Sequence, residues 1–240
     1  MNSRPFTLFV ALAILFAGVL ALRPLERRLR RSAAEGVSPE QLGSLGGQRG
    51  LLAVLGGMRS AVAGAFWLRA HLAWERRDSA ATAAWIELSV AADERPLSFW
   101  LNGARMLAYD LPAWRRPEPA AVRERAGEAH ARLALAFLEK GLRWHGADAA
   151  LYIEMANLHL RRTGDLESAA RCYREAAALP HAPYYAGRIH AELLRELGRP
   201  REALDGLRRM LPRLPADEPE ACRAVVLARI EALEQELAGR

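Results

Sequence analysis

Histidine and cysteine are the residues of this chain best suited to metal binding or nucleophilic chemistry, and they are scattered through the sequence. The two cysteines, Cys172 and Cys222, lie 50 residues apart, and this favours two free thiols over a disulfide. His190 and Glu192 are close in sequence, but side chains two residues apart on a helix point in different directions. The full set of histidines is His71, His130, His145, His159, His181 and His190.

Catalytic motifs are absent from the sequence. It contains no HExxH zinc-protease motif, no paired CxxC, no GxSxG nucleophile motif and no GxxxxGK[ST] phosphate loop. Acidic and basic residues alternate in several places, as in residues 123–125, which is typical of solvated helix faces. We therefore expect no enzymatic activity, no cofactor, no bound metal and no small-molecule substrate.

The net charge of +6 is concentrated near the amino terminus. Residues 23–31 carry a net charge of +4 and Arg4 adds one more, so the rest of the chain is nearly neutral. A nucleic-acid-binding domain would carry a basic stripe across its folded surface. We therefore do not expect nucleic acid to be a partner.

The first 22 residues are predicted to form a transmembrane anchor. Phe6 to Leu22 is an uncharged run of 17 residues, which as a helix would be about 25 Å long, close to the ~30 Å hydrocarbon core of a bilayer. A cleaved signal peptide is the alternative, but the run is long and no clear small-x-small cleavage site follows it. The residues that flank the anchor on its carboxyl side are Arg23, Arg27, Arg28, Arg30 and Arg31.

These arginines also predict the orientation of the chain. Positive charge stays on the cytoplasmic side of a membrane, so the main domain is expected on the cytoplasmic face of a bacterial inner membrane, held by a single span. A periplasmic location is the alternative. The basic cluster could also lie against anionic headgroups. Residues 23–50 are interpreted as a basic, glycine-rich connector.

Residues 51–75 read as a helix interrupted at Gly56-Gly57. Arg59 near the middle of this apolar stretch favours a packed, membrane-adjacent helix over a second span. Abundant alanine and leucine, with few β-branched residues, predict an all-α fold. A repeat domain is expected over residues 51–217, followed by a capping helix in 218–240, whose apolar residues recur on one side from Cys222 to Leu237.

A triplet of small, large and small residues recurs four times with spacing i, i+4, i+7, so its members share one helix face. Successive triplets begin 50, 35 and 34 residues apart. Internal repetition at about 34 residues is typical of stacked helix–turn–helix units. The triplets are Ala84-Leu88-Ala91, Ala134-Leu138-Gly141, Ala169-Tyr173-Ala176 and Ala203-Leu207-Met210.

Helix-breaking residues fall in the same register. Pro96, Gly146 and Pro215 each lie twelve residues after the first member of a triplet. Gly164 and Gly198 each lie five residues before one, where a tight turn between paired helices is expected. The 50-residue interval contains an insertion, and residues 111–120 with their three prolines are predicted to be a loop on a binding face or beside a longer helix.

Residues Gly164 to Ala169, with Tyr173 and Ala176, resemble the tetratricopeptide repeat (TPR), and the stretch from Gly198 to Ala203 is the next best match. The resemblance implies a right-handed α-solenoid with units at about 65–98, 99–148, 149–183 and 184–217. The sequence departs from the family pattern in several places. Met210 stands in place of a small residue, Ser79 in place of the turn glycine of the first unit, and residues 161–163 lengthen the turn of the third.

The same resemblance implies a concave groove lined by the first helix of each pair. The groove residues of most interest are Arg69, Trp100, Asn157, Arg161, Tyr185 and Arg188. Aromatic residues and arginines favour protein interfaces, so the partner is expected to be a protein. The lysine–asparagine set with which some family members capture a peptide carboxylate is not reproduced, since Asn157 alone matches it.

These patterns together predict a membrane-tethered scaffold or adaptor without catalysis, which raises the local concentration of a partner protein at the membrane. Two alternatives keep the same scaffold. One is a periplasmic-facing factor for envelope assembly or secretion, and the other is a noncatalytic subunit of a membrane complex.

Overall fold

The computed structural model describes residues 59–115 and 118–239. The predicted anchor over residues 1–22, the connector and its five flanking arginines lie outside these ranges. Every regular element within them is a helix, which confirms the all-α prediction. No helix among these residues is both long and apolar enough to cross a membrane. The chain divides into two compact units between Asp93 and Glu94, inside the predicted repeat domain, and each unit is described by itself.

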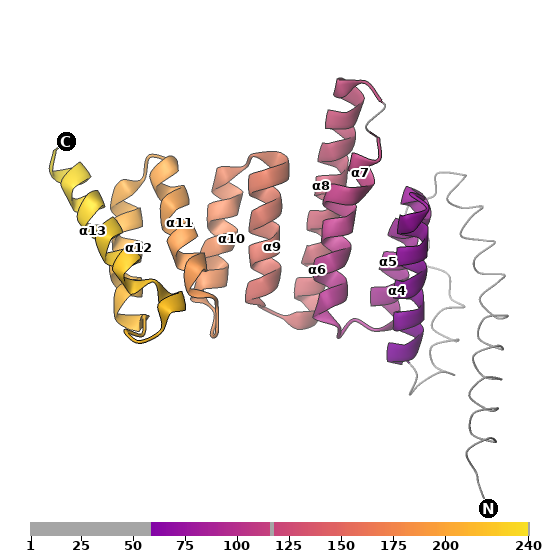
Figure 1. The fold of residues 1–240 in the computed structure, drawn as a ribbon, viewed down its shortest axis with the longest axis horizontal. Helices are drawn as coiled ribbons and strands as arrows, with labels where there is room; N and C mark the ends of the chain where they lie inside the picture. The colour runs from indigo at the N-terminus through magenta and orange to yellow at the C-terminus, as the bar shows by residue number, and fades with distance from the viewer. Residues whose placement is uncertain (1–58, 116–117, 240) are drawn as a thin grey trace, which may run out of the picture. The chain divides into compact units, whose positions relative to one another are not determined.

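The described part of the N-terminal unit is a pair of helices, α4 (Arg59–Glu75) and α5 (Ser79–Ala92). Phe66 of α4 packs against Trp85 of α5, with ring centroids 5.5 Å apart. At the far end from the connecting turn, the hydroxyl of Ser60 donates to Asp93 at 2.6 Å. The two helices lie side by side (Figure 1), joined by an aromatic contact and by a hydrogen bond between their ends.

The turn between α4 and α5 corrects one detail of the sequence register. The left-handed residue of this turn is Arg77, with a φ of 55°, whereas Ser79 is already the first residue of α5. The carboxylate of Asp78 caps α5 by accepting the amide of Ala81 at 3.0 Å. The turn can therefore close two residues earlier than the glycine pattern suggested, at the cost of a strained arginine backbone.

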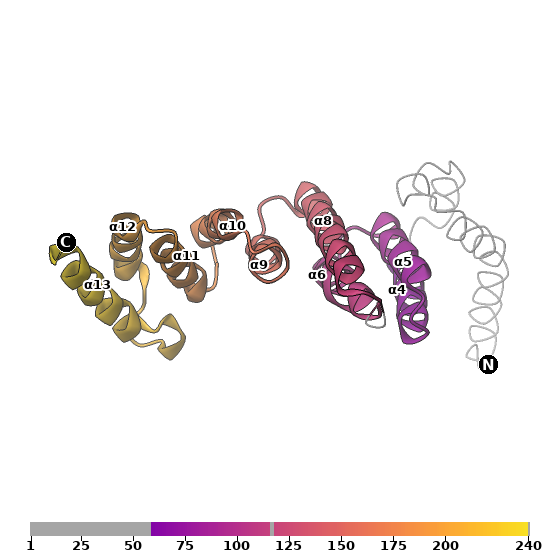
Figure 2. The ribbon, with the colours of Figure 1, turned by 90° about the horizontal axis from the view of Figure 1, so that it is seen from above.

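The C-terminal unit is a row of helices that pack mainly on their neighbours in sequence (Figures 1 and 2). Contacts join α6 to α8, α8 to α9, α9 to α10, α10 to α11, α11 to α12 and α12 to α13. The α-helices are α6 (Leu97–Arg105), α7 (Leu111–Ala113), α8 (Ala120–His145), α9 (Ala149–Leu158), α10 (Leu166–Ala178), α11 (Tyr184–Glu196), α12 (Pro200–Met210) and α13 (Arg223–Ala238). Short 3-10 turns, η4 (Leu211–Arg213) and η5 (Pro219–Ala221), separate α12 from α13.

Residues with small side chains allow these helices to approach closely. Ala134, Ala169, Ala176 and Ala203 of the triplets are all 0% exposed. Ala91 is the exception, because it is exposed at the end of α5 while the next residue, Ala92, is buried. The i, i+4, i+7 pattern thus identifies the buried face of α8 and α10, whereas its last position is exposed in α5 and only partly buried in α12.

Met210 departs from the small residue expected at its position, and the structure accommodates it with a glycine on the facing helix. A Cβ built on Gly187 of α11 would lie 2.7 Å from the sulfur of Met210, so a side chain there would force the end of Met210 to move. Met210 is partly buried against the hydrophobic cluster formed by α11, α12 and α13. In its present position the large residue on α12 uses the space left by Gly187.

In two of the helix pairs, the first helix continues into a π-turn. A π-turn is a local widening of the helix that often occurs at functional sites. These π-turns are η2 (Met106–Asp110), which continues α6, and η3 (His159–Thr163), which continues α9. The amide of Gly164, with a φ of 68°, bonds to the carbonyl of His159 five residues back. The extra residue that the sequence shows in the turn of the third unit is therefore absorbed inside η3.

The loop predicted over residues 111–120 is shorter in the structure, because α7 directly follows the first π-turn. Leu111 and Pro112 are helical and buried in α7, so the loop begins only at Trp114. Pro112 has no amide hydrogen and so leaves a carbonyl of the preceding turn without its helical partner.

The last helix begins later than the sequence suggested. Glu218 to Cys222 form a 3-10 turn and a left-handed residue, and α13 starts at Arg223. The guanidinium of Arg223 donates to the carbonyls of Leu211 and Leu214, at 2.7 and 3.0 Å. These bonds hold the start of α13 against the end of the preceding helix pair, because they satisfy carbonyls that a helix end leaves free.

Glycine substitutions in two helices test how tightly the row is packed. A Cβ on Gly141 of α8 would lie 3.1 Å from Cδ2 of Trp100, a side chain that is only 2% exposed, whereas Gly206 of α12 faces open space. We expect Gly141→Ala to destabilise the fold by about 1 kcal/mol, because overpacking of about 1–3 kcal/mol exceeds a helix-propensity gain of about 1 kcal/mol.

Gly206→Ala is the matched control, and it should stabilise the protein by up to about 1 kcal/mol. Urea unfolding of the full-length chain in mild detergent, followed by circular dichroism, measures both effects. Equal shifts of the two variants would show that Trp100 is free to move.

Candidate partner-binding surface

Tyrosine and arginine side chains from four helices gather on one surface of the C-terminal unit. We name this set the tyrosine–arginine surface. Its members are linked by contacts between helices: Arg105 bonds to Glu154, Arg162 lies over the ring of Tyr109, and Tyr173 bonds to Asn157. The members are Arg105, Tyr109, Glu154, Asn157, Arg161, Arg162, Tyr173 and Tyr185.

The centre of this surface is an ion pair between Arg105 of α6 and Glu154 of α9. Two guanidinium nitrogens of Arg105 approach one carboxylate oxygen at 3.0 and 2.7 Å. The Glu154 side chain is 5% exposed, whereas that of Arg105 is 54% exposed. A buried carboxylate needs a partner, and Arg105 supplies one from the neighbouring helix pair while keeping an outer face in contact with solvent. The bond to Glu154 raises the pKa of Arg105.

The two π-turns bring Tyr109 and Arg162 together. The guanidinium carbon of Arg162 lies 5.6 Å from the centre of the Tyr109 ring, a cation–π geometry. A Cβ on Gly127 of α8 would lie 3.0 Å from Nη2 of Arg162, so the arginine lies flat against that helix only because residue 127 has no side chain. Burial is the main cause that raises the pKa of Tyr109, so the phenol is a neutral donor at physiological pH.

Tyr173 of α10 lies beneath this surface, since it is only 2% exposed, and it contacts the half-buried Asn157. The Tyr173 hydroxyl donates to Oδ1 of Asn157 at 2.9 Å. Burial raises the pKa of Tyr173, and the neighbouring Tyr185 contributes in the same direction. Because Asn157 spends its carbonyl oxygen on this bond, its amide N–H groups are the part that a ligand could use. Tyr185 is 40% exposed at the start of α11.

The six groove residues predicted from the sequence are distributed unevenly. Asn157, Arg161 and Tyr185 lie on the tyrosine–arginine surface, and Arg188 lies one turn after Tyr185 on α11. Trp100 is instead a core residue that stacks on Phe137, with centroids 4.8 Å apart, and donates its indole N–H to the carbonyl of Glu94. Arg69 is half-buried in α4 and belongs to the N-terminal unit.

Sequence reasoning missed Arg105, Tyr109 and Arg162. The fixed positions of the repeat place Gly103 and Leu107 in the groove, and both are buried. Their neighbours Arg105 and Tyr109 are exposed and half-buried, respectively, because α6 and η2 present a different face from the one that the register predicts. The available signals were the insertion after this helix and the two adjacent arginines before Gly164.

No group of three or more histidine, cysteine, aspartate or glutamate side chains within the described ranges could hold a metal ion. Cys172 is buried, and burial raises its pKa, so it is a poor nucleophile. Cys222 is also a free thiol. Burial lowers the pKa of His130, His159 and His190, which favours their neutral forms.

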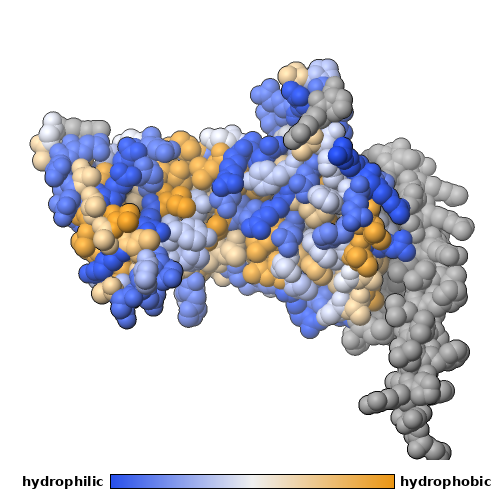
Figure 3. All heavy atoms as spheres, viewed as in Figure 1, coloured by the Kyte–Doolittle hydropathy of each residue, from blue (hydrophilic) through white to orange (hydrophobic). Residues whose placement is uncertain are grey.

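The surface of the C-terminal unit is mixed rather than continuously apolar. In Figure 3, hydrophobic residues of this unit alternate with hydrophilic ones over the row of helices. Such a surface, with aromatic residues and arginines among small apolar areas, has the composition of a transient protein interface. What it can do chemically is bind hydrogen-bond acceptors and carboxylates.

Comparison with known proteins identifies no relative. No protein-family model matches the chain, and no curated protein matches it significantly. Function must therefore be inferred from the geometry of the surface and from the sequence.

The ion pair at the centre of the surface leads to a stability prediction. We expect Arg105→Met to destabilise the protein by about 1–2 kcal/mol, because Glu154 would remain buried without a partner while water reaches it only in part. Adding Glu154→Gln should recover part of this loss. Urea unfolding of the three variants measures the coupling.

Arg132→Met provides the control, since the contact of Arg132 with Glu128 is 3.9 Å long and both side chains are more than half exposed. We expect a loss of less than about 0.5 kcal/mol there. If Arg105→Met costs no more than this control, Glu154 is not held by the ion pair.

Proposed function

We propose that this chain is a membrane-tethered adaptor, in which a TPR-like array of helix pairs binds a partner protein. The observation that carries the proposal is the tyrosine–arginine surface, to which four helices contribute arginines and tyrosines and on which Arg105, Arg161 and Tyr185 are exposed. Such residues supply most of the binding energy at protein interfaces. We interpret the pairs α4/α5, α6/α8, α9/α10 and α11/α12 as the four repeats of the array.

Several features support the TPR-like interpretation. Gly164 and Gly198 both adopt left-handed φ values, 68° and 73°, at the turns inside the third and fourth pairs. Asp165 caps α10 by accepting the amide of Ser168 at 2.9 Å, and Pro200 stands in the first turn of α12. These are the local devices that a tight helix–turn–helix repeat requires.

The membrane part of the proposal rests on the sequence alone. The uncharged run from Phe6 to Leu22 would anchor the chain, and Arg23, Arg27, Arg28, Arg30 and Arg31 would keep the helical domain on the cytoplasmic side. Tethering would concentrate a weakly bound partner near membrane components. A periplasmic assembly or secretion factor and a noncatalytic subunit of a membrane complex remain alternatives with the same scaffold.

Site-specific photo-crosslinking tests the binding role. A photo-reactive residue at Arg161 or Tyr185, introduced in the full-length chain in cells, should give a discrete crosslinked product containing one protein partner. The same residue at Arg201, exposed on α12 away from this surface, is the control. Absence of any product at Arg161 and Tyr185, or an identical product at Arg201, would contradict the adaptor role of this surface.

Protease accessibility of a carboxyl-terminal tag tests the orientation. In spheroplasts the tag should be protected from added protease and become sensitive only after detergent lysis, because the basic flank retains the domain in the cytoplasm. Cleavage in spheroplasts without lysis would instead place the domain in the periplasm. Fractionation of the same cells tests whether the chain sediments with the inner membrane.

A further inference from the structure

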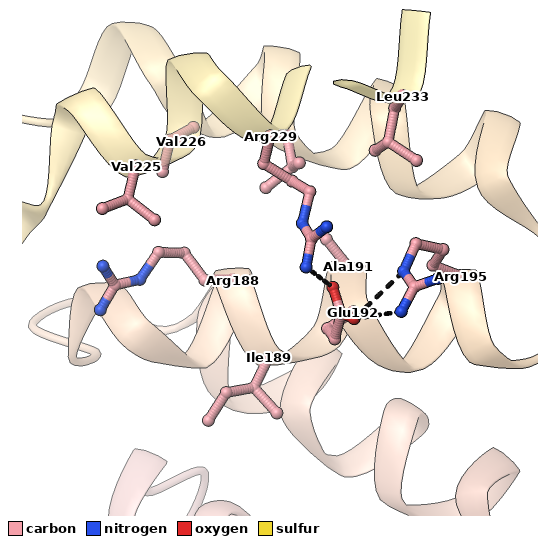
Figure 4. Close-up of a pocket in the computed structure, with 10 residues that line it drawn as sticks. Arg188, Ile189, Ala191, Glu192, Arg195, Val225, Val226, Arg229 and Leu233 are labelled. Atoms are coloured by element: carbon pink, nitrogen blue, oxygen red, sulfur yellow. Dashed lines mark hydrogen bonds and ion pairs between the residues drawn. The ribbon is translucent and has the colours of Figure 1, made fainter. Parts of the chain in front are cut away.

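A pocket between α11 and α13 is lined by apolar side chains together with a small group of charged ones (Figure 4). Its apolar lining comes from both helices and from Leu207 of α12, and its volume is about 230 Å³. A cavity of about 150 Å³ with aliphatic walls is enough to bind benzene, so this pocket can accommodate one large apolar side chain. The apolar lining residues are Ile189, Ala191, Leu207, Val225, Val226 and Leu233.

The charged residues around the pocket are three arginines and one glutamate. Glu192 accepts hydrogen bonds from Arg195 on its own helix, at 2.6 Å, and from Arg229 on α13. These two arginines lower the pKa of Glu192, with the Arg195 bond as the largest cause. One carboxylate therefore balances only part of the positive charge around the pocket.

Arg188 is the arginine of the pocket that does not bond to Glu192. It lines the pocket and, in Figure 4, extends away from Glu192 on the side where Val225 lies. Within residues 59–115 and 118–239, its guanidinium makes no hydrogen bond or ion pair. Val225 on the facing helix is 59% exposed, a high value for a valine at the edge of an apolar pocket. An unsatisfied cation therefore stands beside apolar surface that is open to solvent.

We propose that this pocket binds a large apolar side chain of a partner segment, with an acidic residue of the same segment paired to Arg188. The inference rests on the proposed adaptor function and specifies the chemistry of its partner. Charge complementarity argues for an acidic segment, and the volume of about 230 Å³ argues for one inserted side chain. Arg188 lies three residues after Tyr185, on the same side of α11, so the pocket continues the tyrosine–arginine surface.

The carboxyl-terminal helix thereby becomes part of the binding site as well as a cap. Val225, Val226, Arg229 and Leu233 of α13 form one wall of the pocket. The position of that wall is fixed by the Arg229–Glu192 pair and by the bond from Arg208 of α12 to Glu234 at 2.7 Å. Both pairs link α13 to the preceding helix pair, so the pocket is held open in a defined shape.

A set of short peptides with blocked termini tests the proposal on the full-length chain in detergent micelles. The probe is fluorescein-labelled Glu-Glu-Phe-Glu-Glu, acetylated and amidated so that no terminal carboxylate takes part, and binding is followed by fluorescence anisotropy. Replacing the phenylalanine by alanine, or the glutamates by lysines, should weaken binding by at least about tenfold. Equal binding of all three peptides would overturn the proposal.

Two substitutions at residues lining the pocket locate the site. Arg188→Glu removes the cation that pairs with the probe, and Val225→Glu places a negative charge, like those of the probe, at the pocket edge. Each should weaken binding of the probe by at least about tenfold. Arg213→Glu, an equal charge change at an exposed residue of η4, is the control and should leave affinity within about twofold once general charge effects are screened. Unchanged affinity in Arg188→Glu and Val225→Glu overturns the assignment of the pocket, and displacement of the probe by decanoate alone would assign it to a fatty acid instead.

Crosslinking in cells separates this inference from the adaptor function. If the partner still crosslinks at Arg161 and Tyr185 while the probe fails to use the pocket, only the pocket assignment is wrong. If neither position captures a partner and no probe binds, the adaptor function fails together with it.

Discussion

Close approach between neighbouring helices is the constraint on which the C-terminal unit depends. Ala134, Ala169, Ala176 and Ala203 are completely buried, and each stands where a larger side chain would push two helices apart. Since each helix packs mainly on its neighbours in sequence, the unit has no single central core. Its stability is distributed along the row, as in architectures whose units contact only adjacent units.

The same constraint explains where large residues are allowed. Trp100 packs against the bare backbone of Gly141, and Met210 packs against Gly187. Each pair places a bulky residue on one helix and a glycine on the facing helix, so the volume between the two helices is conserved. Arg162 over Gly127 follows the same rule at a polar contact. Gly127, Gly141 and Gly187 thus mark close contacts rather than breaks in their helices.

The π-turns connect this packing to the candidate binding surface. Each widens the end of a first helix, and together they bring Tyr109 and Arg162 into contact above α8. The insertion that enlarges the second unit therefore has a structural consequence, because its long helix α8 supports both π-turns and the side chains that they project.

The sequence by itself determined the helical class, the spacing of the helix pairs and most of the buried positions on α8, α10 and α12. These follow from periodicity and from the chemistry of glycine, proline and capping aspartates, which act within a few residues. It also identified Asn157, Arg161 and Tyr185, three members of the surface. It placed Trp100 in a groove, although this side chain belongs to the core.

Only the tertiary structure decided which face each first helix presents and which groups meet across helices. The Arg105–Glu154 pair and the Tyr109–Arg162 contact join residues that are 49 and 53 positions apart in the sequence. The pocket between α11 and α13 likewise joins residues of separate helices. A one-residue widening in η2 or η3 rotates the positions that follow. A fixed repeat spacing in the sequence does not reveal that rotation. Side-chain partnership across helices depends on such small rotations, so periodicity alone does not determine it.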